Sequence, residues 1–172
     1  MKLIIKQDTD AQAPNEFDDA EVFLVAGHRQ FFVRPPEFAG SGQPAAFHLV
    51  KYIESKADTH WTFPLEAYIH SGVVLALSGE GNFPDRQWDV SRCGAVLVAK
   101  EHWTEDKART AALGLVETWN QYLSGDVWGV IIEDDEGNHM DSCWGFYGRE
   151  YAETEGQAML AQAEKHSFDP VI

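Results

Sequence analysis

The sequence contains few cysteines and no long apolar run. Only Cys93 and Cys143 occur in 172 residues, and they are not spaced as a CxxC pair. Secreted domains that depend on disulfides carry more cysteines than this. The N-terminal segment has only Leu3 to Ile5 before Lys6, too short an apolar stretch for a signal peptide, and no run approaches the roughly 18 residues of a membrane span. We therefore expect a cytoplasmic protein without membrane association.

Basic residues are scarce. The chain has 13 Lys and Arg against 28 Asp and Glu, which gives a formal net charge of −15. This charge repels phosphate, so it argues against direct binding to nucleic acid or to an anionic membrane. The interval between Arg109 and Arg149 has no Lys or Arg. It contains seven acidic residues, namely Glu117, Asp126, Glu133, Asp134, Asp135, Glu136 and Asp141.

Spacings typical of metal and phosphate sites are also lacking. The seven histidines are scattered, with no HxH or HExxH pattern, and neither cysteine stands at zinc-ligand spacing. Gly79-Glu80-Gly81 lacks the third glycine and the following lysine of a phosphate-binding loop. The sequence predicts no metal and no cofactor.

Core-forming residues are abundant, because 44% of the chain is hydrophobic and 12% aromatic. A chain of this length and composition predicts one folded domain over residues 1–172. Strands are expected at 3–5, 21–26, 30–34, 62–69, 73–77, 95–99, 127–133 and 139–145, and helices at 44–56, 105–123 and 151–165. Runs of strands joined as hairpins indicate an α+β fold, with an antiparallel or mixed β-sheet packed against about three helices.

Two segments give the clearest patterns. Apolar residues between 105 and 123 recur at steps of four and three, which places them on one helix face, and Thr104 precedes them as an N-cap. That face comprises Ala108, Ala112, Leu115, Trp119 and Tyr122. The run Ala95 to Ala99 is continuously apolar, which is typical of a central strand buried on both sides.

Six short motifs follow one another along the chain: Gln7-Asp8, Phe17-Asp18, His70-Ser71-Gly72, Trp88-Asp89, Gly125-Asp126-Val127-Trp128-Gly129 and Asp141-Ser142-Cys143-Trp144-Gly145-Phe146-Tyr147-Gly148. In this order they resemble an uncharacterised family of small proteins from tailed bacteriophages and bacterial mobile elements. The resemblance runs from about Lys2 to Gly148, and the last motif is its most specific part. It implies an accessory protein that acts inside a bacterial host cell, and it transfers no catalytic residue.

Two motifs differ from the usual family pattern. Asn15-Glu16-Phe17-Asp18 stands where an Arg-Glu-Trp-Asp run is usual, and Trp88-Asp89-Val90 stands where Trp-Asp-Ser is usual.

The acids Glu133, Asp134, Asp135 and Glu136 lie at the tip of the hairpin expected from the last two strands, Glu133 as the last strand residue before the turn. One interpretation is a negative surface that binds a host protein with a basic surface, as an inhibitor of host defence or a mimic of nucleic acid would. The alternative is an ordinary solvated turn in a protein kept soluble by its charge.

A small hydrolase or transferase is the second hypothesis, with His70, Asp89, Asp141 and Cys143 as its candidate catalytic residues. In a regular strand, Asp141 and Cys143 share one face, and His139 shares it with them. The structural alternatives are a core position for Cys143 and a hydrogen-bonding role for His70.

Overall fold

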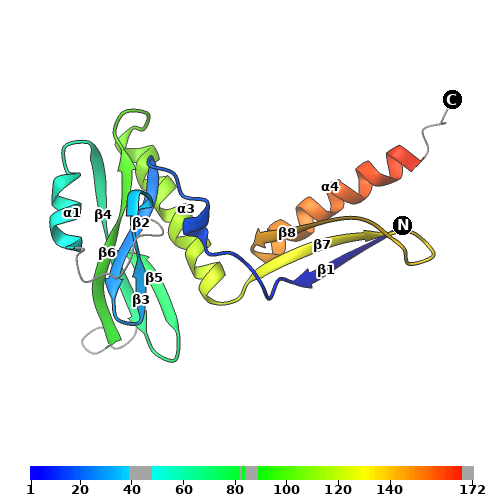
Figure 1. The fold of residues 1–172 in the computed structure, drawn as a ribbon, viewed down its shortest axis with the longest axis horizontal. Coiled ribbons are helices and arrows are strands. Elements are labelled where there is room, and N and C mark those ends of the chain that lie inside the picture. The colour runs from blue at the N-terminus through cyan, green and yellow to red at the C-terminus, as the bar shows by residue number, and fades with distance from the viewer. Residues whose placement is uncertain (39–47, 82, 84–88, 168–172) are drawn as a thin grey trace. The chain divides into compact units, whose positions relative to one another are not determined.

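The structure is a computed structural model that describes residues 1–38, 48–81, 83 and 89–167 (Figure 1). The chain forms two compact units. Unit 1 combines Met1–Gln12 with Ser124–Ile172, and unit 2 is Ala13–Leu123. Unit 2 is therefore inserted into the sequence of unit 1, and each unit is described by itself.

Unit 2 is built on a five-stranded antiparallel sheet in the order β3-β2-β6-β4-β5. Its strands are β2 (Val22–His28), β3 (Phe31–Val33), β4 (His60–Ile69), β5 (Val73–Leu77) and β6 (Val90–Ala99). The helices of this unit are α1 (Leu49–Ser55) and α3 (Glu105–Leu123), with short 3-10 turns η1 (Pro14–Glu16) and η2 (Pro36–Phe38).

The central strand β6 is buried on both faces, as the sequence predicts. Val96 and Val98 belong to the core cluster that includes the inner face of α3, while Ala95 and Leu97 belong to the cluster that includes α1. Beside this run, a Cβ at Gly94 would lie 1.9 Å from the Val25 carbonyl oxygen. Glycine is therefore required at position 94, where β6 passes close to the backbone of β2.

Helix α3 has the bounds that the sequence predicts. The Thr104 hydroxyl accepts a hydrogen bond from the Lys107 N–H at 3.4 Å, consistent with the expected N-cap. Ala108, Ala112 and Trp119 are buried, as expected, whereas Val116 is buried more completely than Leu115. The buried face of α3 thus includes Val116 in place of the predicted Leu115.

The side chain of Asn120 joins α3 to the edge strand β5. Its Oδ1 accepts from the Leu75 N–H at 2.8 Å, and its Nδ2 donates to the Leu75 carbonyl at 2.9 Å. One amide side chain thereby satisfies the outer backbone groups of an edge residue that has no further strand beside it.

Unit 1 is a three-stranded antiparallel sheet in the order β1-β7-β8, with one helix packed on it. The elements are β1 (Lys2–Gln7), β7 (Val127–Glu133), β8 (His139–Tyr147) and α4 (Arg149–Ser167). Leu3, Ile5, Val130 and Ile132 pack against α4. Position 156 of the helix is glycine, because a Cβ there would lie 2.9 Å from the Leu3 side chain.

The predicted α+β class is confirmed, with antiparallel sheets and three helices in the described residues. Pro44 and Phe47, where the first helix was expected to start, lie outside the described residues, as does the predicted turn from position 39 onward. The single-domain boundary of 1–172 stays a prediction. Among the described residues no helix is both long and apolar enough to cross a membrane.

Replacing Asn120 with Ala removes both hydrogen bonds to Leu75 and leaves partly buried backbone groups unpaired. We expect the free energy of unfolding to fall by about 2 kcal/mol. The control Glu117→Ala, on the exposed face of the same helix, should change it by less than about 0.5 kcal/mol. Urea denaturation followed by circular dichroism measures both, and equal stability of the two variants would contradict this role of Asn120.

Candidate functional site

The acidic turn of unit 1 uses one of its four acids for its own structure. The Asp134 carboxylate accepts hydrogen bonds from the backbone N–H groups of Glu136 and Asn138, at 2.9 and 2.8 Å, and from the Asn138 side-chain amide at 2.9 Å. The Asn138 side chain is the main cause of a pKa for Asp134 below its ordinary value. Gly137 closes the turn at a φ of +86°. Asp134 is therefore a turn-forming residue.

The other three acids of this turn differ in their surroundings. Asp135 is 92% exposed and accepts from the α-amino group of Met1 at 2.5 Å. Glu136 is exposed and Glu133 half-buried. Asp135 and Glu136 are consequently the acids of the turn that are best placed to meet a partner.

His70 and Asp89 of unit 2 come together. The His70 Nδ1 lies 3.5 Å from the Asp89 Oδ2, so the ends of β4 and β6 bring the imidazole and carboxylate side by side. The His70 side chain is 70% exposed. Its ring stacks on the Tyr68 ring, with 6.1 Å between the ring centroids, and the Tyr68 ring also stacks on Phe83. Trp88, the other half of the Trp88-Asp89 motif, lies outside the described residues.

The other two candidate catalytic residues, Asp141 and Cys143, lie on β8 in unit 1. Both are exposed, so Cys143 is not a core residue. They pair with Ile132 and Val130, which puts them on the sheet face that carries α4. His139 pairs with Glu133 beyond an irregularity in register, so it lies on the opposite face. The expectation that His139 shares a face with Asp141 and Cys143 is therefore wrong, because the sequence gives no sign of the bulge.

Cys93, the other thiol, is a buried member of the unit 2 core. Its burial, and to a smaller extent the nearby Glu66 carboxylate, raise the pKa of this thiol to about 12. It is therefore poorly suited to act as a thiolate.

Three of the six motifs lie in unit 1, and hydrogen bonds join the first two of them. The Gln7 side chain donates to the Gly125 carbonyl at 2.8 Å, and the Asp8 N–H donates to the Val127 carbonyl at 2.8 Å. The Asp126 carboxylate accepts from the Trp128 indole at 2.5 Å and from the Arg149 N–H at 3.1 Å. Motifs separated by more than 100 residues therefore form one hydrogen-bonded cluster at the start of α4.

The longest motif, Asp141 to Gly148, also determines local geometry. Trp128 of β7 pairs with Phe146 of β8, and Val130 pairs with Cys143. Two residues of β8, Trp144 and Gly145, therefore lie opposite the single residue Gly129. Gly145 adopts a φ of +83° in this bulge. Beyond it, Phe146 packs into the core under α4, and the Tyr147 hydroxyl donates to the Gln12 carbonyl at 2.6 Å.

Trp144 is the residue of this motif that faces outward. Its ring lies directly over Gly129, where a Cβ would stand 2.1 Å from the Trp144 Cε3. This is the sheet face opposite α4, and the indole remains 47% exposed. Beside it lies a groove of about 400 Å³, which Trp144 lines together with Lys6, Gln7, Asp8, Thr9 and Asp10. A large, half-exposed aromatic side chain thus lies over Gly129, beside a groove that Lys6, Asp8 and Asp10 also line.

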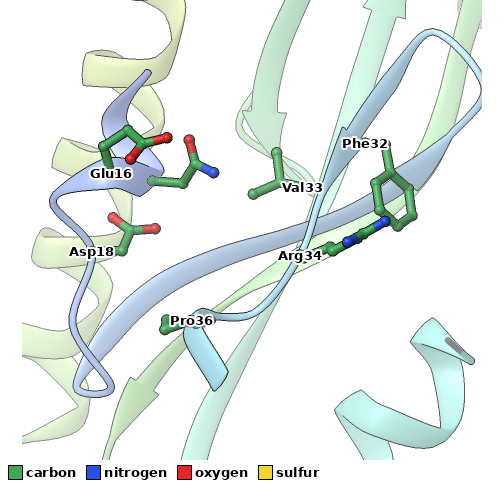
Figure 2. A pocket seen from close by; sticks show the side chains of 7 residues that line it. Glu16, Asp18, Phe32, Val33, Arg34 and Pro36 are labelled. Carbon is green, nitrogen blue, oxygen red and sulfur yellow. The ribbon is translucent and has the colours of Figure 1, made fainter. Parts of the chain in front are cut away.

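A second pocket, of about 300 Å³, lies in unit 2 (Figure 2). One side is formed by Asn15, Glu16 and Asp18, which come from η1 and the loop after it. The other side is formed by β3 and the segment that follows it, through Phe32, Val33, Arg34 and Pro36. Neither Glu16 nor Asp18 is among the site residues that the sequence predicts.

Asp18 is a lining residue of this pocket whose carboxyl pKa is raised. Burial, and to a smaller extent the neighbouring Asp19 carboxylate, raise its pKa to about 7. A hydrogen bond with the Leu24 backbone acts in the opposite direction. Strand β3 ends at Val33, opposite Ala26, so Leu24 lies on the part of β2 that β3 does not cover. A carboxyl that titrates near neutrality within a pocket marks a candidate binding or proton-transfer group.

Comparison with known proteins adds no relative: no protein-family model matches the chain, and no curated protein and no solved structure matches it significantly. The resemblance to the phage family therefore stays a prediction. Within the described ranges, no three His, Cys, Asp or Glu side chains gather as a metal-binding group.

Replacing Asp18 with Asn tests the raised pKa. Wild-type protein should lose stability as the pH rises from about 4 to about 7, because the unfolded chain releases the proton before the folded chain does. The Asn variant lacks this loss. Its free energy of unfolding should therefore gain about 1–2 kcal/mol on wild type between pH 4.5 and pH 8, allowing for the partial exposure of Asp18.

Urea unfolding at the two pH values measures this difference, with the exposed Asp58→Asn as the matched control. If wild type and Asp18→Asn respond to pH in parallel, Asp18 has an ordinary pKa.

Proposed function

We propose that this chain is a non-enzymatic accessory protein of a phage or mobile element that binds a host protein with a basic surface, in the bacterial cytoplasm. Unit 1 supplies the binding surface. The observation that carries the proposal is Trp144, half exposed over Gly129 on the sheet face that α4 leaves open, beside Asp8 and Asp10.

The distribution of charge supports this choice of unit. Unit 1 has 13 acidic and 4 basic residues, a net charge of −9 in 61 residues, whereas unit 2 has 15 and 9, a net charge of −6 in 111. Acidic residues at this density accelerate association with a cationic partner, and the acceleration falls as salt screens the charges. A nucleic-acid-binding groove of a host protein is the kind of partner surface that this charge would mimic.

The open face of the unit 1 sheet also has apolar character. Ile4 and Ile131 form a half-buried cross-strand pair on it, and Trp144 lies further along the same face. Tryptophan is among the residues that contribute most to protein interfaces when surrounding residues exclude water. Lys2 and Lys6 also lie on this face. The acidic residues lie at its two ends, in the Asp134 turn and at Asp8 and Asp10.

The second candidate function is a small hydrolase or transferase, and the contact between His70 and Asp89 favours it. A carboxylate beside an imidazole can orient it as a general base. His70 is mostly exposed, and the other candidates, Asp141 and Cys143, belong to unit 1. The binding function therefore accounts for more of the motif residues.

Capture from a bacterial lysate tests the binding function. Tagged full-length protein should retain a stoichiometric partner at low salt and release it at high salt. Replacing Trp144 with Ala, or Asp135 and Glu136 with Asn and Gln, should weaken capture, while Asp134 is kept because the turn needs it. The matched control Asp58→Asn/Glu101→Gln removes two exposed acids from unit 2.

Once mass spectrometry identifies the partner, its association rate should fall for the Asp135/Glu136 variant and its dissociation rate should rise for Trp144→Ala. Equal capture by all four proteins would exclude the proposed surface on unit 1.

A further inference from the structure

The groove beside Trp144 brings an open aromatic ring and carboxylates to one face of the unit 1 sheet. Lys6 of β1 lies opposite Gly129 of β7, and the Trp144 ring covers Gly129 on the side away from α4. The Asp8 N–H donates to the Val127 carbonyl at 2.8 Å, which continues the pairing of β1 with β7 beyond Lys6. Because alternate residues of a strand point to the same face, Asp8 follows Lys6 onto the face that carries Trp144.

Within the part of the chain that the structure describes, the ring and the carboxylates of this groove have no cationic partner. No cation lies over the indole of Trp144, which is 47% exposed. Lys6, Asp8 and Asp10 line the groove and enter no ion pair. The Asp8 Oδ1 accepts a hydrogen bond from the Asp10 N–H at 3.0 Å, and its Oδ2 keeps its capacity as an acceptor.

We propose that this groove takes an arginine side chain of the host protein, with the guanidinium plane stacked on Trp144 and its N–H donors at Asp8 and Asp10. The inference rests on the proposed function and names the group that the surface of unit 1 recognises. Indole is the aromatic ring that attracts cations most strongly. A guanidinium can stack on it while its N–H donors, which lie in the plane of the group, form charge-assisted hydrogen bonds with carboxylates.

Arginine fits this groove better than lysine does. An ammonium group is compact and strongly hydrated, and its three donors diverge, so it cannot lie flat on a ring. The volume of about 400 Å³ accommodates a guanidinium together with its methylene stem. Lys6 places one positive charge in the lining against the two negative charges of Asp8 and Asp10, so the groove still attracts an incoming cation.

A nuclear magnetic resonance titration of the isotope-labelled full chain at low salt tests the proposal. The indole N–H signal of Trp144, identified by its absence from the spectrum of Trp144→Phe, reports on the groove directly. N-acetyl-arginine methylamide should shift this signal in a saturable way, with a dissociation constant on the order of millimolar. N-acetyl-lysine methylamide should bind about threefold more weakly, and the neutral N-acetyl-citrulline methylamide, which has nearly the same shape as the arginine probe, should give no saturable shift.

The wild-type titration alone can overturn the proposal. It is wrong if the lysine or the citrulline probe binds as tightly as the arginine probe. It is equally wrong if the arginine probe gives no saturable shift up to about 50 mM.

Variants of the lining residues identify the groups that meet the guanidinium. Asp8→Asn keeps an Oδ1 for the Asp10 N–H and removes only the charge, so it should preserve the turn and lower the affinity for the arginine probe about threefold. Asp8→Asn/Asp10→Asn should lower it about tenfold, and Lys6→Gln should raise it about twofold. The matched control is the exposed Glu164→Gln on α4, which should leave it unchanged. An unchanged affinity in the double variant would contradict the role of the two carboxylates.

This titration and the lysate capture can fail separately. Binding of the arginine probe without a captured protein would contradict the proposed function and leave the guanidinium specificity of the groove standing. A captured partner without binding of the arginine probe would keep the proposed function and overturn the assignment of the groove to arginine.

Discussion

The pairing of β1 with β7 is the interaction on which unit 1 depends. Leu3 lies opposite Ile132 and Ile5 opposite Val130, and these four side chains form much of the surface on which α4 packs. The same pairing brings Gln7 and Asp8 to Gly125 and Val127, and so forms one wall of the Trp144 groove. Without it, α4 would have only the β7–β8 hairpin to pack on, and Leu3 and Ile5 would be missing from the core of this unit.

The motif residues of unit 1 divide between architecture and surface. Four of them have a structural role. The Asp126 carboxylate accepts hydrogen bonds, and Gly129 leaves space for the Trp144 ring. Gly145 forms the bulge, and Phe146 packs in the core. Trp144 lies over Gly129 and next to Gly145 in the bulge, and it is itself half exposed. An ordered set of supporting residues around one exposed aromatic side chain is the arrangement expected of a preorganised contact point.

Local patterns in the sequence predict most helices and strands. They do not predict the contacts between segments that are far apart in the sequence. Helix α3 and the hairpins follow from periodicity and turn residues that act over a few positions. The division of the strands into two sheets depends on the pairing of β1 with β7 instead of with a strand nearer in the sequence. No local sequence pattern predicts that pairing. Asp18 likewise looks like one acid among several in a loop, and its raised pKa arises only when the loop packs beside β2. The face of His139 was mispredicted because one bulge reverses alternation.

The insertion of unit 2 between β1 and β7 also orders events during synthesis. At 5–20 residues per second, the 129 positions that separate Leu3 from Ile132 take roughly 6–26 s to translate. Unit 2 can fold in that interval, while the apolar segment Leu3-Ile4-Ile5 waits without a strand beside it. Lys2 and Lys6 flank that segment. Flanking charges of this kind act as gatekeepers against aggregation, so two lysines in a markedly acidic chain protect its first strand until its partner has been made.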